Sequence, residues 1–131
     1  MRQVAILLAG YALIAAAPAA VPMVQPGQWL LKSRDDPREN RSVCLRDVGA
    51  LIQIRHGGTM CSRFTIDNTP SELSIHYTCP GNGHGRTTIK ALTSRLIQID
   101  SQGVVEKQPF AMLLEGRRVG ECPAGSGQAP R

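Results

Sequence analysis

The stretch CSRFTIDNTPSELSIHYTC, residues 61–79, predicts a β-hairpin with one cysteine at the outer end of each strand. The run 67–71 is rich in turn-forming residues, and Pro70 stands midway between Cys61 and Cys79. Reversal of the chain at this point brings the two sulfur atoms together. The hairpin therefore predicts a Cys61–Cys79 disulfide and a domain organised around it.

The apolar pattern of this hairpin conflicts with a strict pairing of the two cysteines. Four residues of the second strand share one face, namely Leu73, Ile75, Tyr77 and Cys79. On the first strand, Phe64 and Ile66 fall on the face opposite to Cys61. A β-bulge between Cys61 and Phe64 would turn both apolar side chains towards the core. A different disulfide pairing would also resolve the conflict, so the connectivity stays open at this point.

The chain contains four cysteines, Cys44, Cys61, Cys79 and Cys122. An even number in a small exported domain predicts two disulfides, for which three pairings exist. If the hairpin selects Cys61–Cys79, the second bridge is Cys44–Cys122. Two such bridges restrict the unfolded chain and would offset a thin hydrophobic core.

The N-terminus has the pattern of a secretory signal peptide. Arg2 precedes an uncharged apolar run, and Ala17-Pro18-Ala19 supplies the small residues that a signal peptidase reads. The apolar run is shorter than the roughly 20 residues of a membrane span, and Tyr11 occupies the place where a lipoprotein signal has its cysteine. We expect cleavage of residues 1–19 and a periplasmic or secreted protein without a membrane anchor.

The remaining chain predicts one β domain over residues 26–123, with an unstructured lead at 20–25 and a disordered tail at 124–131. Short apolar runs separated by turn signals predict further strands at 27–33, 41–45, 86–92, 95–100, 110–115 and 117–122, with a turn at 101–103. The spacing of the apolar residues after Leu45 favours one short helix near residues 46–54. The fold class is therefore all-β, an antiparallel meander curved into a half-barrel or small barrel.

The charge distribution argues against a nucleic-acid surface. The formal net charge is +5, but the basic residues are scattered and aromatic residues make up only 4% of the chain. Nucleic-acid surfaces combine clustered basic side chains with stacking rings. The adjacent pair Arg117 and Arg118 is the candidate contact for an acidic envelope protein or a cell-wall polymer, and we expect the protein to be a monomer.

A zinc site could be drawn from His76, Cys79 and His84, with Cys61 as a fourth ligand. In an oxidising compartment the thiols are expected to be paired, and a disulfide sulfur is not a thiolate ligand. Bridged cysteines also leave no thiol for nucleophilic catalysis. We therefore expect no metal site, no cofactor and no catalytic residue.

Four motifs follow one another in an order that resembles a known family. They are Pro26-Gly27-Gln28-Trp29, Val43-Cys44-Leu45, the hairpin 61–79, and the closing stretch from Gly116 to Pro123. Together they resemble the domain-of-unknown-function family numbered 3617, which consists of small exported bacterial proteins. The resemblance implies export and no assigned activity. We expect a periplasmic binding or envelope-associated structural module without catalytic activity; the alternative is a small metal-binding or enzymatic envelope protein.

Overall fold

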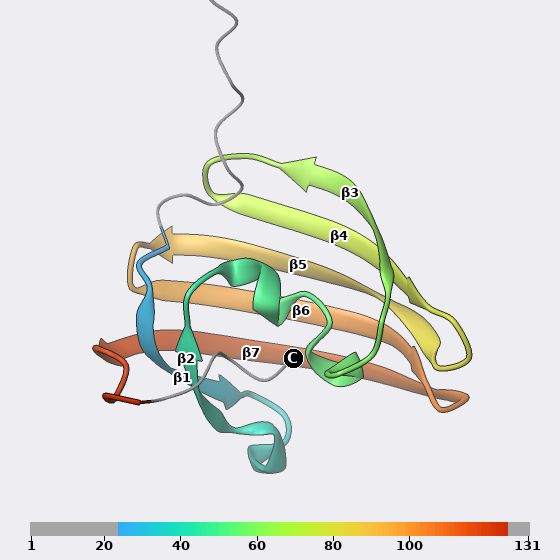
Figure 1. Ribbon diagram of the computed structural model, residues 1–131, viewed down its shortest axis with the longest axis horizontal. Coiled ribbons are helices and arrows are strands. Elements are labelled where there is room, and N and C mark those ends of the chain that lie inside the picture. Colours follow the sequence, from blue (N-terminus) through green and yellow to red (C-terminus); the bar gives the residue numbers. More distant parts are fainter. Residues whose placement is uncertain (1–23, 126–131) are drawn as a thin grey trace, which may run out of the picture.

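The computed structural model describes residues 24–125, so the predicted signal peptide and residues 126–131 of the predicted tail lie outside the described residues. Its main feature is one seven-stranded antiparallel sheet in the order β2-β1-β7-β6-β5-β4-β3 (Figure 1). The strands are β1 (Gly27–Ser33), β2 (Arg41–Leu45), β3 (Ser62–Asn68), β4 (Glu72–Cys79), β5 (Gly83–Thr93), β6 (Leu96–Val105) and β7 (Gln108–Gly120). β3 to β7 form a meander, and the β1–β2 hairpin is added beside β7. The predicted all-β fold is confirmed as an open, curved sheet with β2 and β3 at its edges; it does not close into a barrel.

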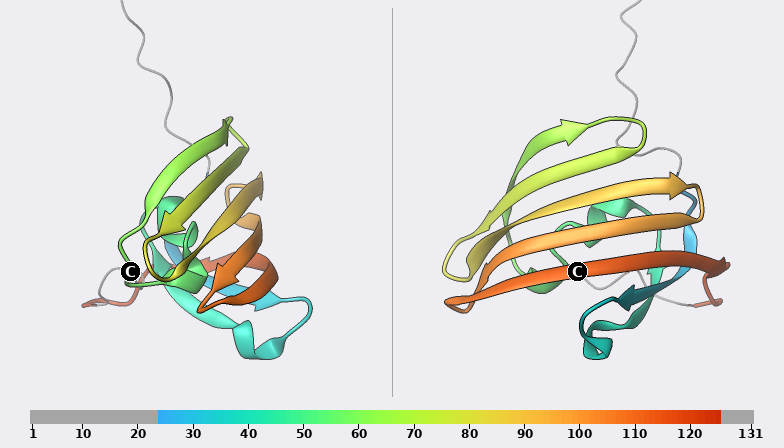
Figure 2. Two further views of the ribbon diagram at one scale, coloured as in Figure 1. Left: turned by 90° about the vertical axis from the view of Figure 1, so that its right-hand side faces the viewer. Right: turned by 180° about the vertical axis from the view of Figure 1, so that it is seen from behind.

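The connection between β2 and β3 crosses the concave face of the sheet (Figures 1 and 2). It contains two 3-10 helices, η2 (Val48–Leu51) and η3 (Ile54–His56), and a third, η1 (Pro37–Glu39), lies in the charged loop after β1. Asp47 caps η2, because its carboxylate accepts a hydrogen bond from the Gly49 N–H at 2.6 Å. The single helix predicted near residues 46–54 is thus present as two short turns, which Gln53 separates with a non-helical backbone.

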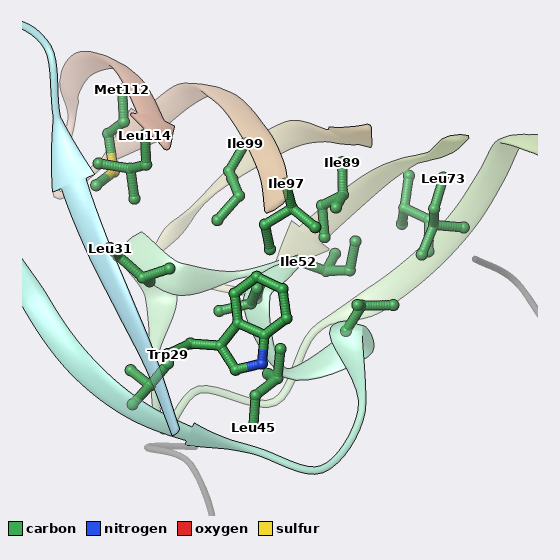
Figure 3. Packing of buried hydrophobic residues seen from close by; sticks show 14 of the residues in the cluster. Trp29, Leu31, Leu45, Ile52, Leu73, Ile89, Ile97, Ile99, Met112 and Leu114 are labelled. Carbon is green, nitrogen blue, oxygen red and sulfur yellow. The ribbon is translucent and has the colours of Figure 1, made fainter. Parts of the chain in front are cut away.

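The hydrophobic core lies between the concave face and this connection (Figure 3). Alternate residues of the strands point inwards, as a period of two requires. The buried apolar side chains from the strands are Trp29, Leu31, Val43, Leu45, Leu73, Ile75, Tyr77, Cys79, Ile89, Ala91, Ile97, Ile99, Met112 and Leu114, and the connection adds Val48, Leu51 and Ile52. The concave face is consequently filled by the protein's own side chains.

Trp29 fixes the chain that precedes β1. Its ring is fully buried, and its Nε1–H donates to the backbone carbonyl of Gln25 at 3.0 Å. The Gln25 N–H in turn donates to the Ser94 carbonyl at 2.9 Å, and Val24 packs against the core. Val24 and Gln25, the two described residues of the predicted lead over 20–25, are therefore held against the domain, because the buried indole N–H requires an acceptor.

The register of the β3–β4 hairpin corrects one prediction about its faces. Ser62 pairs with Thr78, so Cys61 stands opposite Cys79, and the bulge lies between Thr65 and Asp67 rather than after Cys61. Phe64 pairs with the exposed His76 on the outer face, and Phe64 and Ile66 are 70% and 40% exposed. The prediction that Phe64 and Ile66 face the core is wrong, because Cys61 stands opposite Cys79 and no bulge lies between Cys61 and Phe64.

Both cysteine pairs stand at disulfide distance in the predicted arrangement. The Cα atoms of Cys61 and Cys79 are 4.2 Å apart, and those of Cys44 and Cys122 are 5.4 Å apart. The first bridge closes the base of the β3–β4 hairpin. The second connects the edge strand β2 to the chain just beyond β7, across the intervening strand β1.

Two glycine-containing segments predicted as breaks are parts of long strands. The turn predicted at 101–103 is wrong, since β6 continues to Val105 and the chain reverses at Glu106 and Lys107, which have φ values of 49° and 65°. Gly103 serves close packing, because a Cβ atom there would overlap the carbonyl of His84. β7 likewise continues through Gly116, where a Cβ atom would meet core side chains.

Candidate functional site

The strongest candidate for chemistry inside the fold is a buried histidine that joins the β2–β3 connection to the sheet. His56 is 1% exposed, and its Nδ1 lies 2.9 Å from the Tyr77 hydroxyl. Its Nε2 lies 3.0 Å from the carbonyls of both Asn82 and Val104. Carbonyl oxygens only accept hydrogen bonds, so Nε2 carries the hydrogen and Nδ1 accepts from Tyr77. Both ring nitrogens are thus used within the fold.

The polar chain continues across the concave face from Tyr77. Ser101 neighbours the Tyr77 hydroxyl and lies 2.7 Å from the Thr87 hydroxyl, which donates to the backbone carbonyl of Ile52. Burial raises the pKa of the Tyr77 phenol, and the neighbouring Ser101 hydroxyl and the charge of Arg55 only partly oppose this shift. Among residues 24–125, every buried side-chain nitrogen or oxygen has a partner. This network fastens the connection onto the sheet.

The buried network was missed by the sequence reasoning, although two signals for it exist. Thr87 and Ser101 occupy inward positions, each with an isoleucine on one side and a glycine on the other along its strand, and both side chains are fully buried. A polar residue at such a position requires a buried partner. Gly85 is the second signal, since a Cβ atom there would overlap the ring and hydroxyl of Tyr77. The side chains of His56, Tyr77, Thr87 and Ser101 are all buried and cannot contact a ligand from solvent, so we assign this network to the stability of the fold.

The candidate zinc ligands fall on both faces of the sheet. His76 and His84 are exposed on the outer face, and their ring centres are 5.9 Å apart. Cys79 points into the core and is bridged to Cys61. The structure therefore brings the two histidines together but separates them from both sulfur atoms. In the part of the chain that the structure describes, no group of three or more histidine, cysteine, aspartate or glutamate residues could hold a metal ion.

The two candidate contact arginines have different surroundings. The Arg118 side chain is only 5% exposed; it donates to the Pro26 carbonyl at 2.8 Å and to the Glu121 carboxylate at 2.6 Å. The Arg117 side chain is 64% exposed and lies 2.9 Å from Glu115. Arg118 therefore serves the fold by holding the chain before β1 to the end of β7. Arg117 is accessible to solvent, and its contact with a partner stays a prediction.

The adjacent carboxylates Asp35 and Asp36 do not form an acid–base pair. Hydrogen bonds from the Arg38 side chain and backbone lower the pKa of Asp36. The Asp36 carboxylate also caps η1 by accepting from the Arg38 N–H at 3.0 Å. A carboxylate held charged in a solvated loop caps the turn and does not exchange protons near neutral pH.

The remaining notable surface is the edge strand β3. All seven of its residues are exposed, including Phe64 and Ile66. The large exposed apolar side chains among residues 24–125 are Met60, Phe64, Ile66, Leu92 and Val119. Three of these five lie within the segment 60–66, so exposed apolar surface is concentrated at one edge of the sheet.

No helix in the described part of the chain, residues 24–125, has the length and apolar character needed to cross a membrane. Comparison of the whole chain with protein-family models, with curated proteins and with solved structures found no match.

Proposed function

We propose that this protein is a non-catalytic binding module of the bacterial cell envelope, and that it binds another protein through the edge strand β3. The observation that carries this proposal is the concentration of exposed apolar side chains at β3 and in the residues before it. Met60 is 90% exposed, and Phe64 is 70% exposed. Single apolar residues are common on protein surfaces, whereas a group of them beside an unpaired strand edge marks an interaction site.

The backbone of β3 supports the same proposal. β3 pairs only with β4, so its other side presents unpaired N–H and C=O groups. An extended segment of a partner can add to such an edge, with main-chain hydrogen bonds giving affinity and side chains giving specificity. The bulge between Thr65 and Asp67 interrupts the edge, so the proposed contact lies on residues 62–65, which include the exposed Phe64 side chain.

The other surfaces of the protein give less support to binding or catalysis. The concave face is occupied by the core and by the β2–β3 connection. The Arg118 guanidinium hydrogen-bonds the Glu121 carboxylate and the Pro26 carbonyl, so within the basic pair only Arg117 offers an accessible charge. All four cysteines are bridged and His56 is enclosed. An acidic partner or a cell-wall polymer that contacts Arg117 would be a second, independent contact.

The envelope location rests on the signal-peptide pattern, on the two disulfides and on the resemblance to the family numbered 3617. Disulfides form and persist in oxidising compartments such as the periplasm. The open edge strand of a monomer fits a role in which the partner supplies the neighbouring strand. We propose that the exported protein is monomeric until it binds.

Site-specific photo-crosslinking tests this function. A photo-crosslinking phenylalanine analogue at position 64 should give a discrete adduct with one envelope protein. The same analogue at position 92 serves as control, because Leu92 is also exposed but lies in β5, which β4 separates from β3. An excess of unlabelled protein should compete the adduct away, whereas the double variant Phe64→Ser, Ile66→Thr should compete poorly. Equal adducts from positions 64 and 92, or no adduct at either, would refute the proposal.

A further inference from the structure

Two exposed histidines lie beside each other on the outer face of the sheet. In the β4–β5 ladder His76 pairs with Arg86 and Thr78 pairs with His84, so the two histidines are diagonal neighbours on adjacent strands. Diagonal neighbours in an antiparallel pair are within reach of long and aromatic side chains. Their ring centres are 5.9 Å apart, and the ring planes are inclined by 32°.

This separation suits a single metal ion bound by both rings. Metal–nitrogen bonds of about 2.0–2.1 Å, one to each imidazole, place the two ring centres about 4.5–6.4 Å apart, depending on the angle at the metal. The observed 5.9 Å falls within this range. Both side chains are exposed, so rotation about their side-chain bonds can aim one nitrogen of each ring at a common point without moving the core.

The positive charge next to the pair is directed away from it. Arg86 stands opposite His76, and its Nε–H donates to the Ser74 hydroxyl at 3.4 Å. Ser74 lies on the side of His76 away from Thr78, the residue that pairs with His84. The guanidinium therefore extends along β4 in the direction opposite to His84, which reduces its repulsion of a cation between the rings.

No other described side chain competes for the same type of metal. The chain contains three histidines, and the third, His56, uses both ring nitrogens inside the fold. All four cysteines are bridged, so no thiolate is available. A metal that prefers imidazole nitrogen consequently has His76 and His84 as its two accessible ligands, and water fills the other coordination positions.

We propose that His76 and His84 form a two-imidazole binding site for a divalent transition-metal ion, with Cu²⁺ bound more tightly than Ni²⁺ or Zn²⁺. The preference for Cu²⁺ follows from the general order of stability for nitrogen ligands. The site uses neither Cys79 nor Cys61 and does not depend on the partner contact proposed for β3. Mg²⁺ and Ca²⁺, which prefer oxygen ligands, do not bind there.

Isothermal titration calorimetry on the untagged, disulfide-bonded protein tests this site with Cu²⁺ and, separately, with Mg²⁺ as the probes. One Cu²⁺ ion should bind per chain, with no binding of Mg²⁺. Because the second imidazole binds intramolecularly, His76→Gln and His84→Gln should each weaken Cu²⁺ binding by about tenfold or more, and the double variant should lose it. Lys90→Gln, an exposed substitution on the outer face of β5, is the matched control and should bind like the wild type.

Electron paramagnetic resonance of the Cu²⁺ complex supplies a second measurement. Hyperfine structure from two equivalent imidazole nitrogens is expected for the wild type, and from one for each single variant. Both substitutions are at exposed positions, so the near-ultraviolet circular dichroism should be unchanged. Wild-type Cu²⁺ affinity in the double variant, or a wild-type spectrum without nitrogen hyperfine structure, would overturn the proposal.

Discussion

The Nδ1 atom of His56 lies 2.9 Å from the hydroxyl oxygen of Tyr77, and both residues are buried. The bond connects η3, in the segment that crosses the concave face, with β4 in the sheet. Because the Nε2–H of the same ring donates to two backbone carbonyls, one imidazole fixes the connection to three different parts of the meander. The bond is therefore a point at which the attachment of the connection to the sheet can be tested.

Replacement of Tyr77 by phenylalanine should destabilise the protein by about 1–3 kcal/mol, because the buried Nδ1 of His56 loses its only donor. Urea denaturation followed by circular dichroism measures the change. The exposed neighbour Thr78 provides the control, since Thr78→Val should alter the free energy of unfolding by less than about 0.5 kcal/mol. Equal stability of Tyr77→Phe and the wild type would show that the bond does not fasten the connection.

The raised pKa of Tyr77 makes stability dependent on pH in the alkaline range. The folded state holds the phenol proton more tightly than the unfolded state, so the stabilisation is complete below the unfolded pKa, near 10, and is lost as pH rises through the higher folded pKa. Unfolding free energies measured from pH 8 to 12 should therefore fall above about pH 10. In the same pH series, the free energy of unfolding of Tyr77→Phe should fall less steeply. Parallel curves for the variant and the wild type would show that Tyr77 is not the source of the pH dependence.

Much of the fold follows from local pattern, and the departures have physical causes. Most of the strands and the approach of Cys61 to Cys79 could be predicted, because alternation and turn residues are local signals. The face of the sheet on which Phe64 and Ile66 lie could not be predicted, because all residues of the edge strand β3 are exposed and its apolar residues do not mark a buried face. The hydrogen bond between His56 and Tyr77 depends on how the β2–β3 connection folds back over the sheet, and the periodicity of apolar residues in the sequence does not predict that path.

The corrected face of β3 predicts a contrast between two apolar positions in one hairpin. Phe64→Ser should change the free energy of unfolding by less than about 0.5 kcal/mol, since Phe64 is 70% exposed. Ile75→Ala, on the inward face of β4, should cost about 2–5 kcal/mol through lost burial and the cavity left behind. Denaturation of the two single variants under identical conditions measures both values. If Phe64→Ser lowered the free energy of unfolding as much as Ile75→Ala, Phe64 would have to be packed in the core.

The two disulfides should make separable contributions that follow the length of chain each one closes. Cys61 and Cys79 are separated by 18 residues and Cys44 and Cys122 by 78, so the loss of unfolded-chain entropy predicts about 3 kcal/mol for the first bridge and about 4.5 kcal/mol for the second. The double variants Cys61→Ala, Cys79→Ala and Cys44→Ala, Cys122→Ala are compared with the wild type by chemical denaturation without reductant.

Removal of the Cys61–Cys79 bridge also takes the buried Cys79 sulfur out of the core. The lost packing adds to the loss from chain entropy, so the difference in unfolding free energy between the two double variants becomes smaller. Amide hydrogen exchange separates these effects by location. Loss of Cys44–Cys122 should accelerate exchange chiefly in β1 and β2, which this bridge ties to the end of β7, whereas loss of Cys61–Cys79 should accelerate it in β3. Uniform acceleration over the whole sheet in both variants would mean that each bridge acts only on global stability and that neither edge strand is held locally.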